Sequence, residues 1–70
     1  MTDREWIAAF ARRLGVEPPG DGEFDAILRL AAEAAHASER TAAPVACWLA
    51  GAAGRPLEEA IRLAEEASAA

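Results

Sequence analysis

The chain has 70 residues, 20 of them alanine, and a net charge of −5 from 12 acidic and 7 basic residues. It lacks the apolar run of about 18–20 residues that spans a bilayer, the β-rich composition of a sandwich or barrel, and the basic balance of a nucleic-acid-binding protein. With Cys47 as its only cysteine, it can form no internal disulfide, which is typical of the reducing cytoplasm. Because alanine is the strongest helix former, we expect one cytoplasmic all-α domain over residues 1–70 with a thin core.

The first predicted helix covers about residues 3–14. Thr2 and Glu5 have the spacing of a capping box, in which each side chain accepts a hydrogen bond from the other residue's backbone amide. Gly15 marks the end of the helix. Apolar residues recur between these signals at helical spacing and predict one apolar face, made of Trp6, Ile7, Phe10 and Leu14.

The second predicted helix is the longest and covers about residues 23–39. A loop with two prolines and three glycines precedes it, because these residues are costly inside a regular element. We expect Leu30 to flank the buried stripe rather than belong to it. The predicted stripe itself consists of Phe24, Ile27, Leu28, Ala31, Ala34 or Ala35, and Ser38.

Two prolines predict the starts of the remaining helices, since proline is tolerated in a first helical turn. Pro44 opens a third helix over about 44–53, and Pro56 opens a fourth over about 56–68. The residues predicted to face inward are Val45, Trp48, Leu49 and Ala52 in the third helix, and Leu57, Ala60, Ile61 and Ala64 in the fourth. Four short helices with short links predict a compact all-α bundle.

One polar segment could bind an anion. Glu33, His36 and Arg40 are three and four residues apart and so share one helical face. After Thr41 the chain turns towards Pro44, where the amides of the third helix's first turn, assigned to Val45 and Ala46, would lack helical acceptors. An arginine beside a helix N-terminus can hold a phosphate or carboxylate.

A structural interpretation of the same residues is favoured. Arg40 would pair with a nearby glutamate at the end of its helix, and His36 would donate to a backbone carbonyl of the corner. No metal site is predicted, because no closely spaced pair of zinc ligands occurs. Cys47 is interpreted as a small apolar residue rather than as a nucleophile paired with His36. No catalytic motif is present, so we expect neither an enzyme nor a bound cofactor.

Residues suited to protein contacts form a second candidate set. Trp6 and Trp48 are natural interface anchors if exposed, and Gly51 and Gly54 leave one side of the third helix bare. Burial of either tryptophan in the core or at its rim is the simpler interpretation.

The segment from His36 to Gly54 resembles a small actinobacterial domain of unknown function. The shared residues are His36, Arg40, Ala42, Ala43, Pro44, Val45, Trp48, Leu49, Gly51 and Gly54. Similar sequences stand alone or are fused to the molybdenum cofactor guanylyltransferase, and position 41, often proline among them, is Thr41 here. The resemblance implies a partner in that enzyme or in a molybdoenzyme, and this chain has none of the enzyme's own nucleotide-binding or metal-binding motifs.

Three hypotheses follow from the sequence. The leading one is a non-catalytic helical interaction module that is accessory to molybdenum cofactor biosynthesis. The second is a binder of a small anion, nucleotide or pterin through His36, Arg40 and the start of the third helix. The third is a dimerisation module that associates through the tryptophans and the glycine face.

Overall fold

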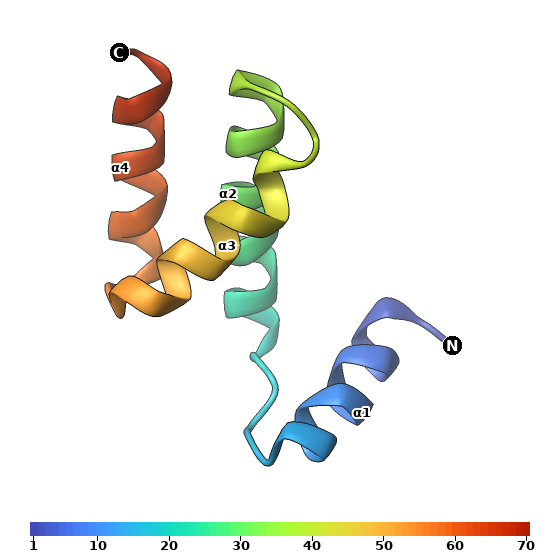
Figure 1. Ribbon diagram of the computed structural model, residues 1–70. Helices are drawn as coiled ribbons and strands as arrows, with labels where there is room; N and C mark the ends of the chain where they lie inside the picture. Colours follow the sequence, from blue (N-terminus) through green and yellow to red (C-terminus); the bar gives the residue numbers. More distant parts are fainter.

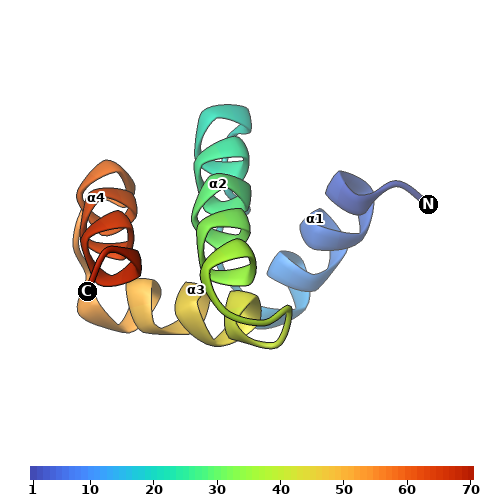
Figure 2. The same cartoon turned by 90° about the horizontal axis from the view of Figure 1, so that it is seen from above.

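The computed structural model describes residues 1–70 and contains four α-helices and no strand, which confirms the predicted all-α fold. The helices are α1 (Asp3–Leu14), α2 (Asp21–Ala37), α3 (Ala42–Ala53) and α4 (Leu57–Ser68). Helices α2 and α4 run side by side in the same direction, and α3 crosses both on one side (Figures 1 and 2). Helix α1 stands apart, beyond the side of α2 that faces away from α4 (Figure 2). None of the four helices has both the length and the apolar composition needed to cross a lipid bilayer.

The capping signals of α1 act as predicted. The Glu5 amide donates to Thr2 Oγ1 at 3.1 Å, and the Thr2 amide donates to Glu5 Oε1 at 2.7 Å. The hydrogen bond that the Thr2 amide donates to the carboxylate, with a smaller contribution from the Thr2 side chain, lowers the pKa of the Glu5 carboxyl below its usual range. Gly15 ends the helix with φ of 79°, a left-handed conformation that glycine adopts without steric cost.

Two helices begin two residues earlier than predicted. Helix α2 begins at Asp21 rather than at position 23, because the Gly20 amide donates to Glu23 Oε1 at 3.1 Å and caps the helix there. Helix α3 begins at Ala42, so Pro44 occupies its third position rather than its first. The first turn of a helix has no acceptors for its amides, so a proline there sacrifices no helical hydrogen bond.

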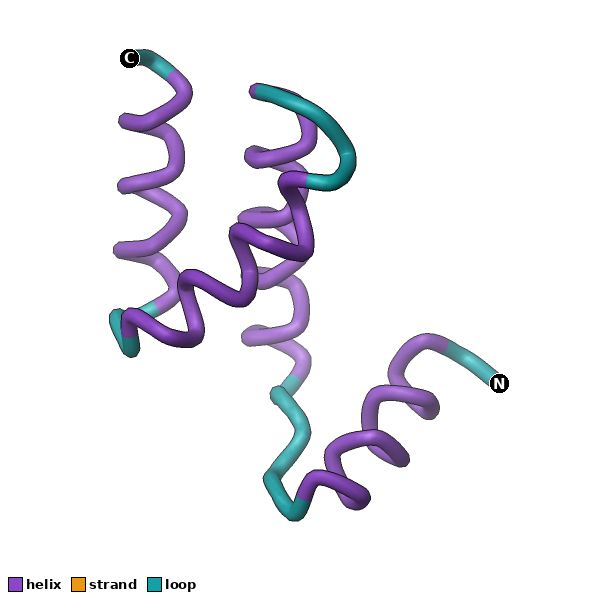
Figure 3. The backbone as a smooth tube through the Cα atoms, viewed as in Figure 1, coloured by secondary structure: helices purple, strands orange, loops and turns teal.

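Two further helix limits differ from the prediction by one or two residues, and the remaining ones match it. Helix α2 ends at Ala37 instead of position 39, and the loop to α3 follows at once (Figure 3). Helix α4 begins at Leu57, directly after Pro56. Gly54 ends α3 in the left-handed region with φ of 68°, as the sequence predicts.

Helix α2 is the centre of the packing, since it packs extensively against both α3 and α4 while these two hardly touch each other. The core consists of Ala26, Leu30 and Ile61. Ile61 and its neighbours on α4 confirm the predicted stripe of that helix. The stripe of α2 is rotated: Leu30, predicted to flank it, is buried, whereas Leu28 is 52% exposed.

Helix α3 faces the opposite way from the prediction. Val45, Trp48, Leu49 and Ala52 were expected to point inward, and all four are exposed. The side that packs on the core carries Cys47 and Ala50 instead. Small side chains on that side let the backbone of α3 lie close to α2, and the large side chains are left outside.

Helix α1 is attached to α2 mainly through one arginine. The Arg4 guanidinium carbon lies 4.1 Å from the centre of the Phe24 ring, and its nitrogens pair with Asp21 at 3.4 Å and Asp25 at 3.2 Å. The apolar face predicted for α1 exists but is mostly uncovered: Trp6, Phe10 and Leu14 are exposed, and the only buried residue is Ala11.

Candidate functional site

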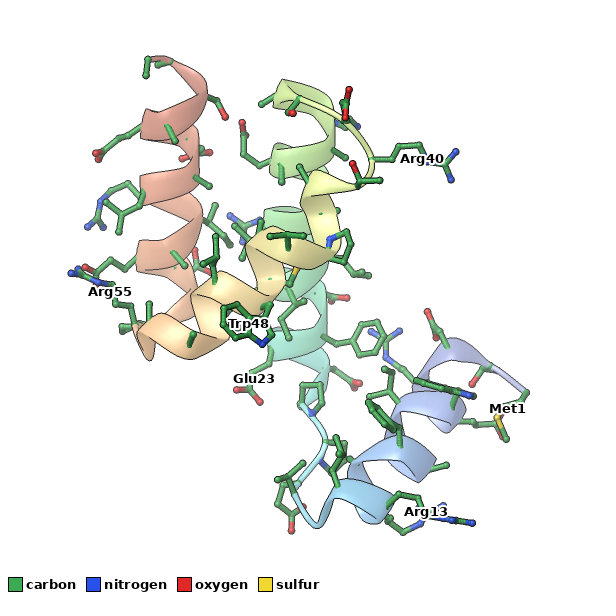
Figure 4. All side chains as sticks on the ribbon, viewed as in Figure 1. Met1, Arg13, Glu23, Arg40, Trp48 and Arg55 are labelled. Carbon is green, nitrogen blue, oxygen red and sulfur yellow. The ribbon has the colours of Figure 1, made fainter.

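No hydrogen bond or ion pair joins Glu33, His36 and Arg40 to one another. The side chains of His36 and Arg40 are exposed and make no hydrogen bond or ion pair, so neither holds the corner between α2 and α3 in place. Arg40 extends from the loop away from the helices (Figure 4). Glu33 instead accepts a hydrogen bond from Ser68 Oγ at 2.5 Å and so links α2 to the end of α4.

Two amides at the N-terminus of α3 are paired with carbonyls of the loop that joins α2 to α3. The amides of Ala42 and Ala43 donate to the carbonyls of Glu39 and Arg40 at 2.9 and 3.2 Å, and Pro44 has no amide hydrogen. The Thr41 side chain makes no capping hydrogen bond. Because α3 begins at Ala42, the Ala46 amide lies beyond the first turn and has an acceptor position within the helix. The Val45 amide donates no hydrogen bond to the Thr41 carbonyl, whereas the corresponding bond is present at the start of each of the other three helices.

Cys47 lies on the packed side of α3. Its Sγ lies 3.9 Å from the Ile27 carbonyl oxygen, to which the thiol donates. Burial raises the pKa of the Cys47 thiol, and this direction is opposite to the one that activates a nucleophilic cysteine. No group of three or more His, Cys, Asp or Glu side chains is placed to hold a metal ion.

The outer side of α3 is an exposed apolar surface without charged residues. Val45, Trp48 and Leu49 are 59%, 71% and 57% exposed, and no residue of α3 is buried. All 19 charged residues lie outside the segment 41–54. An exposed apolar patch of this kind usually marks a contact with another molecule. Two signals in the sequence point to this surface: the absence of charge over the segment 41–54, and Trp48, which was singled out as a possible interface anchor.

A long apolar groove runs along one flank of α3. Its volume is about 770 Å³, and 14 of its 18 lining residues are hydrophobic. The groove exists because α3 and α4 each pack on α2 but not on each other. Leu30 belongs to its α2 side, Val45 and Leu49 to its α3 side, and Leu63 to its α4 side.

A smaller hollow lies between α3, the middle of α2 and the start of α4. It has a volume of about 390 Å³, and its lining includes Ile27, Cys47, Gly51 and Gly54. The sequence-predicted interface residues Gly51 and Gly54 therefore do border an open space. Trp48, which is adjacent to Cys47 in the chain, projects from the near side of α3 in Figure 4.

Trp6, the fourth predicted interface residue, belongs to a different part of the molecule. Its ring centre lies 5.2 Å from that of Phe10 on α1. Helix α1 does not pack extensively against α3, so the two tryptophans belong to separate surfaces. The candidate site is therefore centred on α3, with the groove and the hollow beside it.

The chain matches one known protein family. Comparison with curated proteins and with solved structures gave no significant match. One family model, described as a domain of unknown function (DUF6457), matches residues 2–70. Because this match takes in almost the entire chain, the protein belongs to the DUF6457 family.

Proposed function

We propose that the chain is a non-catalytic interaction module that binds a protein partner in the groove beside α3. The observation that carries this proposal is the groove itself, a space of about 770 Å³ with 14 hydrophobic residues among the 18 that line it. Val45 and Leu49 are exposed on one side of it, so a partner would remove large apolar side chains from water. Each fully buried side chain of this kind contributes about 1.5–3 kcal/mol.

The groove suits an amphipathic helix of the partner. Its sides are helices, and it is rich in alanine, so an incoming helix could approach closely and insert larger apolar residues at helical spacing. Charged groups occur near its limits, where Glu33 is held by Ser68 and Arg55 pairs with Glu59. An apolar centre with a polar rim is the usual composition of a protein interface.

The pathway in which this module acts is proposed from the resemblance described above. Similar sequences are fused to the molybdenum cofactor guanylyltransferase, and two domains fused in one chain commonly act on the same task. We therefore propose that the stand-alone chain is an accessory protein of molybdenum cofactor biosynthesis. Its partner would be that guanylyltransferase or a molybdoenzyme.

Calorimetric titration of the chain into the guanylyltransferase of the same organism tests this proposal. Leu49→Asp places a charge in the groove and is expected to reduce the affinity at least tenfold. Leu28→Asp is the matched control, because Leu28 has nearly the same exposure, 52% against 57%, and does not line the groove. Equal binding by both variants would place the contact elsewhere, and no binding by the unmodified chain would remove this partner.

A further inference from the structure

We propose that the chain forms a two-fold symmetric homodimer in which Trp48 of each copy enters the smaller hollow of the other. This contact lies on a different flank of α3 from the groove proposed above for a protein partner. The hollow includes Gly51 and Gly54 in its lining, and Trp48 is the most exposed of the large apolar residues after Met1. Three observations support the second copy as the occupant: exposed area, charge distribution and shape.

The first observation is the amount of exposed surface. The chain exposes 5303 Å², whereas a monomer of 7.3 kDa is expected to expose about 4,200 Å². The excess of about 1,100 Å² exceeds the roughly 800 Å² that each partner buries in a standard stable interface. The radius of gyration agrees, since it is 12.6 Å against about 11 Å expected for this length. The excess is shared between α1, which stands apart and exposes Trp6, Phe10 and Leu14, and the outer side of α3, so a second copy that covers α3 would remove part of it.

The second observation is the distribution of charge. Each copy carries a net charge of −5, so two copies repel each other unless they meet through surface without charge. The segment 41–54, which includes all of α3, contains no charged residue. The acidic residues lie on the other elements, as in Glu58, Glu59, Glu65 and Glu66 of α4. The face of α3 therefore brings no like charges together, and the charged residue that lines the hollow is the cation Arg55, which pairs with Glu59.

The third observation is that this face can fit a copy of itself. A two-fold interface requires one patch that carries both the projection and the space that receives it. Trp48 and Gly51 are three residues apart and so are neighbours on the surface of α3. The indole of Trp48 projects, while at Gly51 a side chain would meet nothing within 4 Å. The hollow beside Gly51 measures about 390 Å³, within the range of about 300–1,000 Å³ of pockets that accept small molecules.

Two variants of α3 separate this contact from folding. Gly51→Leu fills the entrance of the hollow in the partner's path, meets no atom of its own chain, and replaces a glycine in a helix with a good helix former. This variant is therefore expected to fold at least as well as the unmodified chain. Trp48→Ala removes the projecting group, which is 71% exposed and contributes little to the monomer's own core.

Sedimentation equilibrium across the micromolar range, with circular dichroism to check folding, is the test. The unmodified chain is expected to reach twice its 7.3 kDa mass, and both variants are expected to weaken the dimer at least tenfold. The control Leu28→Ala changes an exposed leucine outside the hollow and should leave the mass unchanged. An unmodified chain that stays monomeric, or variants that dimerise normally, would overturn the proposal.

The proposed dimer and the proposed groove contact can be refuted independently of each other. A monomeric chain that still binds the guanylyltransferase in a Leu49-dependent manner refutes the dimer and retains the proposed function. A dimer that dissociates on Gly51→Leu and binds no such enzyme retains the dimer and refutes the proposed partner.

Discussion

Helices α3 and α4 have the same length, 12 residues each, and both pack on α2. They differ in which of their residues are buried and which are exposed to water. Helix α4 buries Ile61 and presents its charged residues to water. Helix α3 buries no residue completely, has no charged residue, and exposes Val45, Trp48 and Leu49. Within the single chain, the apolar side of α4 is packed against α2, whereas the large apolar side chains of α3 are left exposed to water. This difference is why the functional proposals centre on α3.

The largest expected effect comes from removing one apolar side chain from each of the two helices. Ile61→Ala is expected to lower the free energy of unfolding by about 2–4 kcal/mol, because it leaves a cavity beside Leu30 and Ala26. A core of this size supplies roughly 3–5 kcal/mol in total, so much of the variant should be unfolded at 25 °C. Leu49→Ala is expected to cost less than about 0.5 kcal/mol in the monomer. Urea denaturation followed by circular dichroism at low protein concentration measures both, and equal losses would show that α3 belongs to the core.

The next test compares two glycines of the same segment. Gly54 has φ of 68° and Gly51 has a helical φ, and a side chain would meet no atom within 4 Å at either position. Gly54→Ala should therefore destabilise by about 1–2 kcal/mol through backbone strain, whereas Gly51→Ala should stabilise by about 1 kcal/mol through helix propensity. Thermal unfolding monitored by circular dichroism measures both changes. Shifts of the same sign would mean that the end of α3 at Gly54 is wrongly placed.

Thiol reactivity distinguishes the two sides of α3. Because burial raises the pKa of the Cys47 thiol, it should react with iodoacetamide at pH 8 several-fold more slowly than free cysteine does. The double variant Cys47→Ser, Leu49→Cys moves the thiol to the exposed side and should react at nearly the free rate. Mass spectrometry of timed samples gives both rates. A Cys47 as reactive as free cysteine would contradict the packing of α3 on α2.

The smallest expected effect concerns α1, which also exposes an apolar face but has a polar cap at its start. The folded-state pKa of Glu5 is depressed, so the cap contributes stability above the carboxyl's ordinary pKa of 4.5 and loses it as the pH falls below that value. The helicity of α1, followed by NMR chemical shifts of residues 3–8, should therefore decline on acidification. Glu5→Gln should largely remove this dependence in α1, and an unchanged acid transition in the variant would assign it to another carboxyl.

The polar site predicted near His36 shows where sequence reasoning succeeded and failed. The predicted helical spacing holds for Glu33 and His36, which both lie on α2, but it is wrong for Arg40, because α2 ends at Ala37 and Arg40 lies in the loop after it. Spacing alone does not show that Glu33 bonds Ser68 from α4, a residue 35 positions away. Contacts between distant segments depend on how helices pack, and no local pattern encodes them.

Local chemistry determined most of the elements. The capping box of Thr2 and Glu5, the left-handed glycines at positions 15 and 54, and the strong apolar stripe around Ile61 all act within a few residues of the chain. These features predicted four helices, with ends correct to within two residues. The sequence also singled out Gly51, Gly54 and Trp48 as interface candidates; the two glycines line the smaller hollow and Trp48 is exposed, and their role at an interface stays a prediction.

Only the tertiary structure decided which side of α3 is inside. Val45, Trp48 and Leu49 form one stripe of large residues along α3, but periodicity cannot tell whether such a stripe faces the core or a contact with another molecule. Packing on α2 selected the small residues around Cys47 and Ala50 because they permit close approach, and it left Trp48 outside. The composition already indicated a thin core. Because α3 packs on α2 through its small residues, its large apolar residues form an exposed face instead of adding to that core.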